Sequence, residues 1–406
     1  MPQDRTKLAE RLREARTEAG LTQEQVADWL GVRRPAIAEI EAGKRAVKST
    51  ELVRLAELYG KSLRWLIQGD ESAEERVAAA LFRAQEPTTP LLRREVAKLA
   101  RRCRLISELE EKLDLRRHHD ILPQYANDRA LHDFSAAMQH GTQVAYQERA
   151  RLRIGVAAPI RDAWGVIEDA GLHVFPLRLG ADREIDGVFT RLTDTQACVG
   201  VNVDKWVFRQ VFTVVHEYGH ALMDGDIPAE ACVTIRGWDL SRSRTTYQNR
   251  ELRANQFAAV FLVPREALQR YLHSREKLVQ GRARALTPID VVRAQDHFGV
   301  SAEMLLWRLR NEGLIDAAER KQLAEAINRT GVLTIARALG YEWRDRAQPF
   351  SRIQELALKG YAKGFVSLGV VADLFDRQKD EMYDLLAAWG VKQEFAPDDA
   401  LVGTGS

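Results

Sequence analysis

The sequence predicts a mainly α-helical protein with a small sheet (class α+β), and three observations lead to this prediction. Apolar residues recur every three or four positions through most of the 406-residue chain, which is the helical period. Three short apolar runs between residues 172 and 202 are bounded by turn residues, as is typical of strands. The length suits two to four domains, and a composition of 45% hydrophobic and 29% charged residues supplies their cores.

The overall composition excludes several classes of protein. The formal net charge is only +2, so any nucleic-acid site has to be a local patch. The polar N-terminus does not resemble a secretory signal, and no run of 18 apolar residues is present. The cysteines Cys103, Cys198 and Cys232 are far apart, as expected for reduced thiols. We therefore expect a cytoplasmic protein without membrane contact.

Residues 1–70 are expected to form a domain of five short helices. Thr22 and Gln25 have the spacing of a capping box at the start of a helix over 23–30. Gly31 follows as a tight turn, and a helix over 34–41 comes next, with a proline in its first turn. Two short helices joined by a glycine turn are the helix-turn-helix pattern, in which the second helix enters the major groove of DNA.

The strings 21–32 and 37–45 closely resemble the XRE (Cro/C1-type) helix-turn-helix domain. The resemblance implies binding to operator DNA, usually as a dimer, and so a protein associated with the nucleoid. Arginine suits bidentate contact with guanine, and both lysine and arginine neutralise phosphates. A helical bundle that binds only protein is the alternative. By matching position, the DNA contacts would come from Gln23, Arg33, Arg34, Ala36, Lys44 and Arg45.

Residues 71–145 are expected to be a helical linker region, broken by a Pro/Thr segment at 86–90. Beyond that break, five apolar residues at spacings of three and four form a seam like that of a short coiled coil. The seam would either pair two chains or pack on a neighbouring helix of the same chain. The adjacent residues 118–120 (His-His-Asp) point apart and are not expected to share a metal. The seam consists of Leu92, Val96, Leu99, Cys103 and Ile106.

Residues 146–270 carry the main chemical motif. A helix over 151–170 and strands over 172–177, 187–192 and 197–202 precede an apolar helix that contains His216-Glu217-Tyr218-Gly219-His220. Two histidines four apart lie on one face of a helix and can hold one zinc ion. Glu217 beside them can act as the general base toward a water molecule on the metal.

A third protein ligand is needed for a catalytic zinc site, and the sequence offers two. Asp226 follows His220 by six residues, which requires a sharp end to the helix. Glu251 belongs to a later helix, on which Tyr247, Glu251 and Asn255 share a face because they are four apart. Asn255 would then support a ligand histidine through the free nitrogen of its ring.

The strings 214–223, 251–258 and 262–264 resemble the ImmA/IrrE family of metallopeptidases, and the resemblance spans roughly residues 145–315. It implies a zincin-like domain with a gluzincin-like site in which His216, His220 and Glu251 bind Zn²⁺, with Mn²⁺ as the alternative, and Glu217 is the base. It also implies that the substrate is an XRE-type repressor, cut to release silenced genes. Tyr247 is the predicted donor to the oxyanion, with Arg209 as a second choice.

The last part of the chain is expected to be helical. Residues 271–330 would form a subdomain like a helix-turn-helix, with a turn at 299–301, and residues 331–406 a C-terminal helical region. The C-terminal region is either a module that senses a signal or docks the substrate, or a cap that completes the peptidase core.

Together these features predict a DNA-associated, zinc-dependent endopeptidase that cleaves an XRE-type repressor and so derepresses stress or mobile-element genes. The alternative is an XRE-type regulator whose peptidase-like domain senses or binds without proteolysis. A third hypothesis is cleavage of the chain's own N-terminal domain. The expected partners are operator DNA at residues 1–70 and the repressor protein, and homodimerisation is left open.

Overall fold

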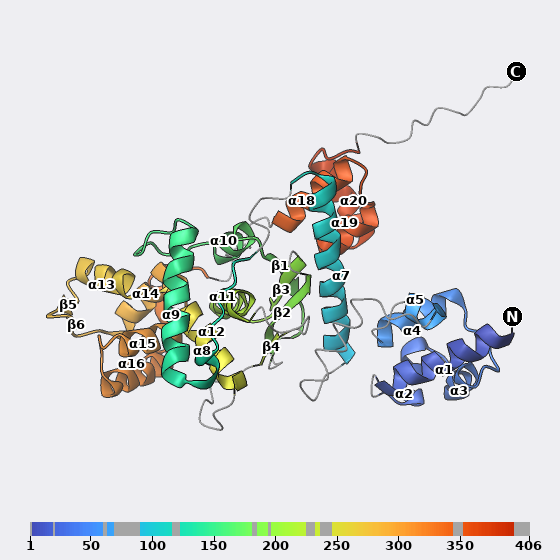
Figure 1. Ribbon diagram of the computed structural model, residues 1–406, viewed down its shortest axis with the longest axis horizontal. Helices are drawn as coiled ribbons and strands as arrows, with labels where there is room; N and C mark the ends of the chain where they lie inside the picture. Colours follow the sequence, from blue (N-terminus) through green and yellow to red (C-terminus); the bar gives the residue numbers. More distant parts are fainter. Residues whose placement is uncertain are drawn as a thin grey trace, which may run out of the picture.

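The computed structural model describes residues 2–18, 21–59, 63–68, 90–115, 122–180, 185–193, 196–224, 232–235, 246–343 and 352–393. Helices account for most of these residues, and the strands form a four-stranded and a two-stranded sheet (Figure 1). The predicted fold class, mainly α with a small sheet, is therefore confirmed. No helix among the described residues is long and apolar enough to cross a membrane.

Five helices form the N-terminal domain, which is drawn in blue in Figure 1. Thr22 and Gln25 make the predicted capping box, and Gly31 adopts a left-handed φ of 71° in the turn that follows. The core contains Leu12, Val26, Ile37 and other apolar residues of all five helices. The helices are α1 (Pro2–Glu18), α2 (Gln23–Leu30), α3 (Arg34–Glu41), α4 (Ser49–Tyr59) and α5 (Leu63–Gln68).

The four-stranded sheet has the strand order β1-β3-β2-β4. Strands β1 (His173–Leu177) and β3 (Gln196–Asn202) are parallel, whereas β2 (Ile185–Thr193) is antiparallel to both β3 and β4 (Cys232–Ile235). The first three strands lie where the sequence predicts them. The edge strand β4 was not predicted, because its four residues are too few to show a clear alternation.

Each face of the sheet is covered by a different helix. A side chain added at Gly187 of β2 would meet Thr213 of α11 (Val207–Met223), so the face of the sheet toward which it would point lies on α11. A side chain at Gly200 would meet Leu99 of α7 (Pro90–Lys112), so the opposite face lies on α7 (Figure 1). The alternation of side chains along the strands therefore divides the sheet between two hydrophobic clusters.

Helix α12 (Thr246–Leu262) packs closely between α11 and α9 (Phe134–Arg151). Small residues permit this approach. An added Cβ atom at Gly219 of α11 would lie 2.9 Å from Phe257, and one at Gly141 of α9 would lie 2.3 Å from the carbonyl oxygen of Arg253. Two shorter helices complete this layer, α8 (Arg129–His132) and α10 (Ala163–Asp169).

The following segment is helical except for a short two-stranded sheet at 278–283, which was not predicted. Its turn at Gly299 has a left-handed φ of 68°, and Ser301 caps the next helix. Apolar residues of this segment, among them Phe298 and Leu306, share one hydrophobic cluster with α11 and α12. The elements are α13 (Arg265–Ser274), β5 (Leu278–Val279), β6 (Arg282–Ala283), α14 (Pro288–Phe298), α15 (Ala302–Asn311), α16 (Ala317–Thr330) and α17 (Val332–Ala338).

The C-terminal helices α18 (Arg352–Ala362), α19 (Leu368–Leu374) and α20 (Lys379–Ala388) pack with α7, as Figure 1 shows. The buried Arg102 of α7 donates hydrogen bonds to the side chain and carbonyl of Asp373.

The apolar seam of α7 is therefore covered by its own chain. Its residues Val96, Leu99, Cys103 and Ile106 are fully buried among the sheet and the C-terminal helices. Of the two interpretations of the seam, packing within the chain is the one that the structure supports. Residues 86–89 of the predicted linker, the side chain of Leu92 and residues 118–120 lie outside the described part, and the last linker residue, Pro90, begins α7.

Candidate metal centre

The helix α11 carries the histidines of the motif through the middle of the molecule. From Thr213 to Met223 every residue is buried, which is why the motif is embedded in an apolar sequence. The helical spacing of four puts His216 and His220 on one face, with their ring centroids 4.7 Å apart. Glu217 is also fully buried.

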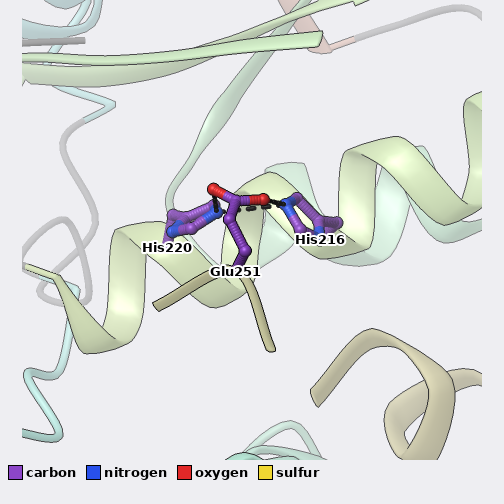
Figure 2. A group of neighbouring side chains, drawn as sticks. All are labelled: His216, His220 and Glu251. Carbon is purple, nitrogen blue, oxygen red and sulfur yellow. Dashed lines mark hydrogen bonds and ion pairs between the residues drawn. The ribbon is translucent and has the colours of Figure 1, made fainter. Parts of the chain in front are cut away.

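The structure brings Glu251 of α12 to the two histidines (Figure 2). Its two carboxylate oxygens lie 3.4 Å from Nε2 of His216 and 3.3 Å from Nε2 of His220. The two Nε2 atoms are 3.0 Å from each other. Three ligand atoms from two helices therefore converge on one point.

This donor set fits a divalent metal such as zinc. Two imidazole nitrogens and one carboxylate are the protein ligands of many catalytic zinc sites, which keep a further position for water or substrate. A hydrogen bond at Nδ1 of His220 directs the lone pair of its Nε2 toward the centre, as a ligand requires. Burial by itself raises the pKa of Glu251, but the nearby His220 and the hydrogen bonds with both histidines lower it well below its usual range.

Asp224, which the sequence analysis did not single out, holds His220 in place. Its Oδ2 accepts a hydrogen bond from Nδ1 of His220 over 2.6 Å. Its Oδ1 accepts hydrogen bonds from Arg253 and from Arg250, the latter over 3.0 Å. Burial raises the pKa of Asp224, but the bond with His220 and the two arginine charges outweigh burial and lower it. Asp224 follows His220 by four residues, and this spacing is the signal in the sequence that could have revealed it.

Asn255, the residue predicted to support a ligand histidine, does not do so in the described structure. Nδ1 of His216 has no hydrogen-bond partner among the described residues, and Nδ1 of His220 is bonded to Asp224. The prediction considered only the residues on the Glu251 face of α12. The carboxylate that supports His220 is instead that of Asp224, which lies at the end of α11, one helical turn after His220.

Glu217 faces β2 at a position where the strand has no side chain. An added Cβ atom at Gly187 would lie 3.1 Å from Oε1 of Glu217 and 2.5 Å from Cγ2 of Thr213. A larger residue at 187 would therefore displace the glutamate or the helix. Gly187 is a second site residue that the sequence analysis missed, since nothing in the sequence shows which strand residue lies opposite Glu217.

The remaining predicted site residues of this domain lie elsewhere or outside the described part. Arg209 is held by an ion pair with Asp186, with its Nε 2.8 Å from the carboxylate, and is seven residues before His216. Tyr247 belongs to α12, but its side chain is not among those described. Asp226 also lies outside the described residues.

The predicted DNA-binding residues are all in the N-terminal domain. Arg33 and Arg34 are exposed at the start of α3, and Ala36, two residues after Arg34, is half-buried. Lys44 is exposed after this helix.

Acidic side chains contact three of the predicted DNA-binding residues, of which Arg34 pairs with the exposed Glu24 over 3.8 Å. Gln23 donates a hydrogen bond to Glu41 over 2.9 Å, so its amide is held at the start of α2. Arg45 pairs with Glu51 over 2.7 Å. A phosphate would therefore have to compete with a carboxylate for Arg45.

Two family models match the chain. Residues 12–66 match the model described as helix-turn-helix. Residues 167–310 match the model described as IrrE N-terminal-like domain, a peptidase family, and this range contains His216, His220 and Glu251. The chain therefore joins an N-terminal helix-turn-helix domain of the XRE type to an ImmA/IrrE-like domain, as the resemblances predict.

Proposed function

We propose that this protein, which joins a helix-turn-helix domain to an IrrE-like peptidase domain, is a zinc-dependent endopeptidase that cleaves an XRE-type transcriptional repressor. The observation that carries the proposal is the convergence of His216, His220 and Glu251 beside the buried Glu217. Ligands on two helices and a base one residue from the first ligand are what metal-assisted hydrolysis of a peptide requires.

The roles of the residues follow from their chemistry. A bound zinc ion would supply Lewis acidity and lower the pKa of a water molecule toward neutrality. Glu217 accepts the proton from the attacking water and returns it to the nitrogen of the leaving amine. Its buried position, opposite Gly187, holds the carboxylate in one place between these two transfers. Asp224 keeps the ring of His220 oriented toward the metal position.

The substrate class is supported by the domain that accompanies the peptidase. A helix-turn-helix domain that binds operator DNA raises the local concentration of the peptidase near repressors bound to the same DNA. Cleavage of such a repressor would remove its operator binding and derepress stress or mobile-element genes. Because the chain's own N-terminal domain is of the repressor type, cleavage of the chain itself is a related reaction to be tested.

The experiment compares cells that carry the wild-type protein with cells that carry Glu217→Gln, after DNA damage, by sequencing new protein N-termini. Glutamine fills the same space but cannot take a proton. We expect a new N-terminus within an XRE-type repressor in wild-type cells alone, with metal content unchanged in the variant. Equal repressor cleavage in both strains would refute the proposal. Equal transcriptional responses without any cleavage would favour a regulator that acts without proteolysis, and an N-terminal fragment of this chain would identify self-cleavage.

A further inference from the structure

A cavity of about 540 Å³ lies at the end of α11 that is remote from the metal ligands. One wall comes from the peptidase sheet and the start of α11, and the other comes from α15, α16 and α17. Its size is in the range of pockets that bind ligands. The residues around it are Asp186, Lys205, Trp206, Arg209, Ser301, Ala302, Glu303, Leu306, Arg320, Ala324, Ile327, Asn328 and Val332.

The cavity combines an apolar side with a polar rim. The half-buried Ala324 and Val332 contribute apolar surface from the helical wall, and Ala302, Leu306 and Ile327 are buried behind them. Trp206, which is 41% exposed, and the charged residues form the rim. An apolar side chain that is attached to a polar backbone matches this combination, because the side chain would be buried while the backbone stayed near polar groups.

The rim has charges of both signs. Arg209 and Lys205 both pair with the buried Asp186, at 3.8 Å in the case of Lys205. The guanidinium of Arg320 lies 4.3 Å from the centre of the Trp307 ring, and no carboxylate of the described residues pairs with it. Glu303 is exposed on the same rim. This balance does not select a strongly charged ligand, which favours a peptide segment over a small anion.

The cavity and the metal centre share one face of α11. Arg209 at the cavity precedes the metal ligand His216 by seven residues, which is two helical turns, so both lie on the same side of α11. The register between β2 and β4 shifts by one residue between Ile185 and Gly187. Such a bulge changes where side chains point. As a result Asp186 contacts Arg209 while its neighbour Gly187 faces Thr213 and Glu217.

The separation can be converted into peptide length. Eight residues of helix between Arg209 and Glu217 span about 12 Å at 1.5 Å per residue. An extended peptide covers about 3.3 Å per residue. A residue bound in the cavity would therefore lie about three or four positions from the bond that is cleaved.

We infer that this cavity is a specificity subsite, which binds an apolar side chain of the substrate three or four residues from the scissile bond. The inference rests on the proposed peptidase activity and adds to it a requirement on the substrate sequence. The subsite selects aliphatic or aromatic residues because contact with Trp206, Ala324 and Val332 would remove the apolar surface of the bound side chain from water.

The test uses the full-length protein loaded with zinc and a library of peptides from a bacterial proteome. The variant Ala324→Trp places a large side chain in the cavity. Ala318→Trp makes the same change at an exposed position of the same helix α16 and is the matched control. We expect wild type and Ala318→Trp to cleave peptides with apolar residues at these positions, and Ala324→Trp to lose this preference. Burial of one apolar side chain predicts a fall in kcat/KM of roughly tenfold to a hundredfold on the preferred peptides.

A second measurement separates the subsite from the activity. Glu217→Gln, with and without Ala324→Trp, is immobilised, and the peptides that it retains are sequenced. Retention of apolar peptides that Ala324→Trp abolishes would support the subsite even if the wild type cleaved nothing. Cleavage without a preference at these positions, or equal retention by both immobilised proteins, would overturn the inference while leaving the proposed activity to its own test.

Discussion

Replacing Asp224 with asparagine should weaken zinc binding about tenfold to a hundredfold, which is the usual effect of losing a hydrogen-bonded carboxylate behind a ligand histidine. Asp224 is 2% exposed and accepts a hydrogen bond from His220 at 2.6 Å. Asparagine has nearly the same shape and keeps one oxygen for this bond. The substitution loses the negative charge that keeps the proton of His220 on Nδ1 and so leaves the lone pair of its Nε2 free for the metal.

The same substitution also affects the stability of the peptidase domain. Arg253 is 1% exposed and donates to Asp224 and to the carbonyl of Met223. Removal of one partner from a buried ion pair costs about 3–5 kcal/mol, because the remaining charge stays buried without compensation. We expect Asp224→Ala to suffer this full loss and Asp224→Asn to suffer less, since an amide oxygen can still accept from the guanidinium.

The assay is competition for zinc with a chelator of known affinity, followed by hydrogen exchange at the amides of α11 and α12. Glu325→Gln is the control, because it removes one negative charge from a side chain that is 59% exposed. A folded Asp224→Asn protein that binds zinc within twofold of the wild type would refute the role of Asp224. Faster exchange with unchanged zinc affinity would show that the carboxylate serves only the packing of α11 on α12.

Three other predictions follow from single residues. Glu251→Ala should lose bound metal by elemental analysis, and full occupancy would instead favour Asp226 as the third ligand. Gly187→Ala should destabilise the domain by about 1–3 kcal/mol through overpacking and lower peptidase activity, because its Cβ atom would lie 2.5 Å from a threonine methyl group of α11. Gly155→Ala, whose Cβ atom would lie 3.6 Å from its nearest neighbour, should leave both unchanged in denaturation and cleavage assays. Burial raises the pKa of Glu168 from its ordinary value of 4.5 to about 7 in the folded protein. Between these two pH values the folded state therefore keeps a proton that the unfolded state releases. The wild type should therefore lose up to about 3 kcal/mol of stability as the pH rises from about 4.5 to 7. Glu168→Gln should not show this loss, and parallel stability curves for the two proteins would contradict the assignment.

Local patterns explain why much of the fold could be predicted. The capping box at Thr22 and the glycine turn at Gly31 depend on residues within one helical turn, and both are present as predicted. The spacing of His216 and His220 specifies a shared helix face without any tertiary information. The position of Glu251 could be proposed only as one of two acidic candidates, beside Asp226, and the structure places it beside both histidines.

Features that depend on distant contacts could not be predicted. The role of Gly187 depends on how β2 lies over α11, and no periodicity in either segment encodes this register. The edge strand β4 owes its conformation to pairing with β2. The apolar seam of α7 shows that the helix packs against something, but the sequence alone cannot distinguish a second chain from the sheet and C-terminal helices that cover it.

The covering of α7 from both sides has a consequence for the synthesis of the protein. Residues of α7 are made before the sheet, but part of their hydrophobic cluster comes from α18, α19 and α20, which are translated more than 200 residues later. Until residues 352–388 leave the ribosome, the outer side of the seam remains exposed to water or to chaperones. The peptidase domain therefore cannot complete this part of its core during most of translation, and a cell would not contain a fully packed enzyme on unfinished chains.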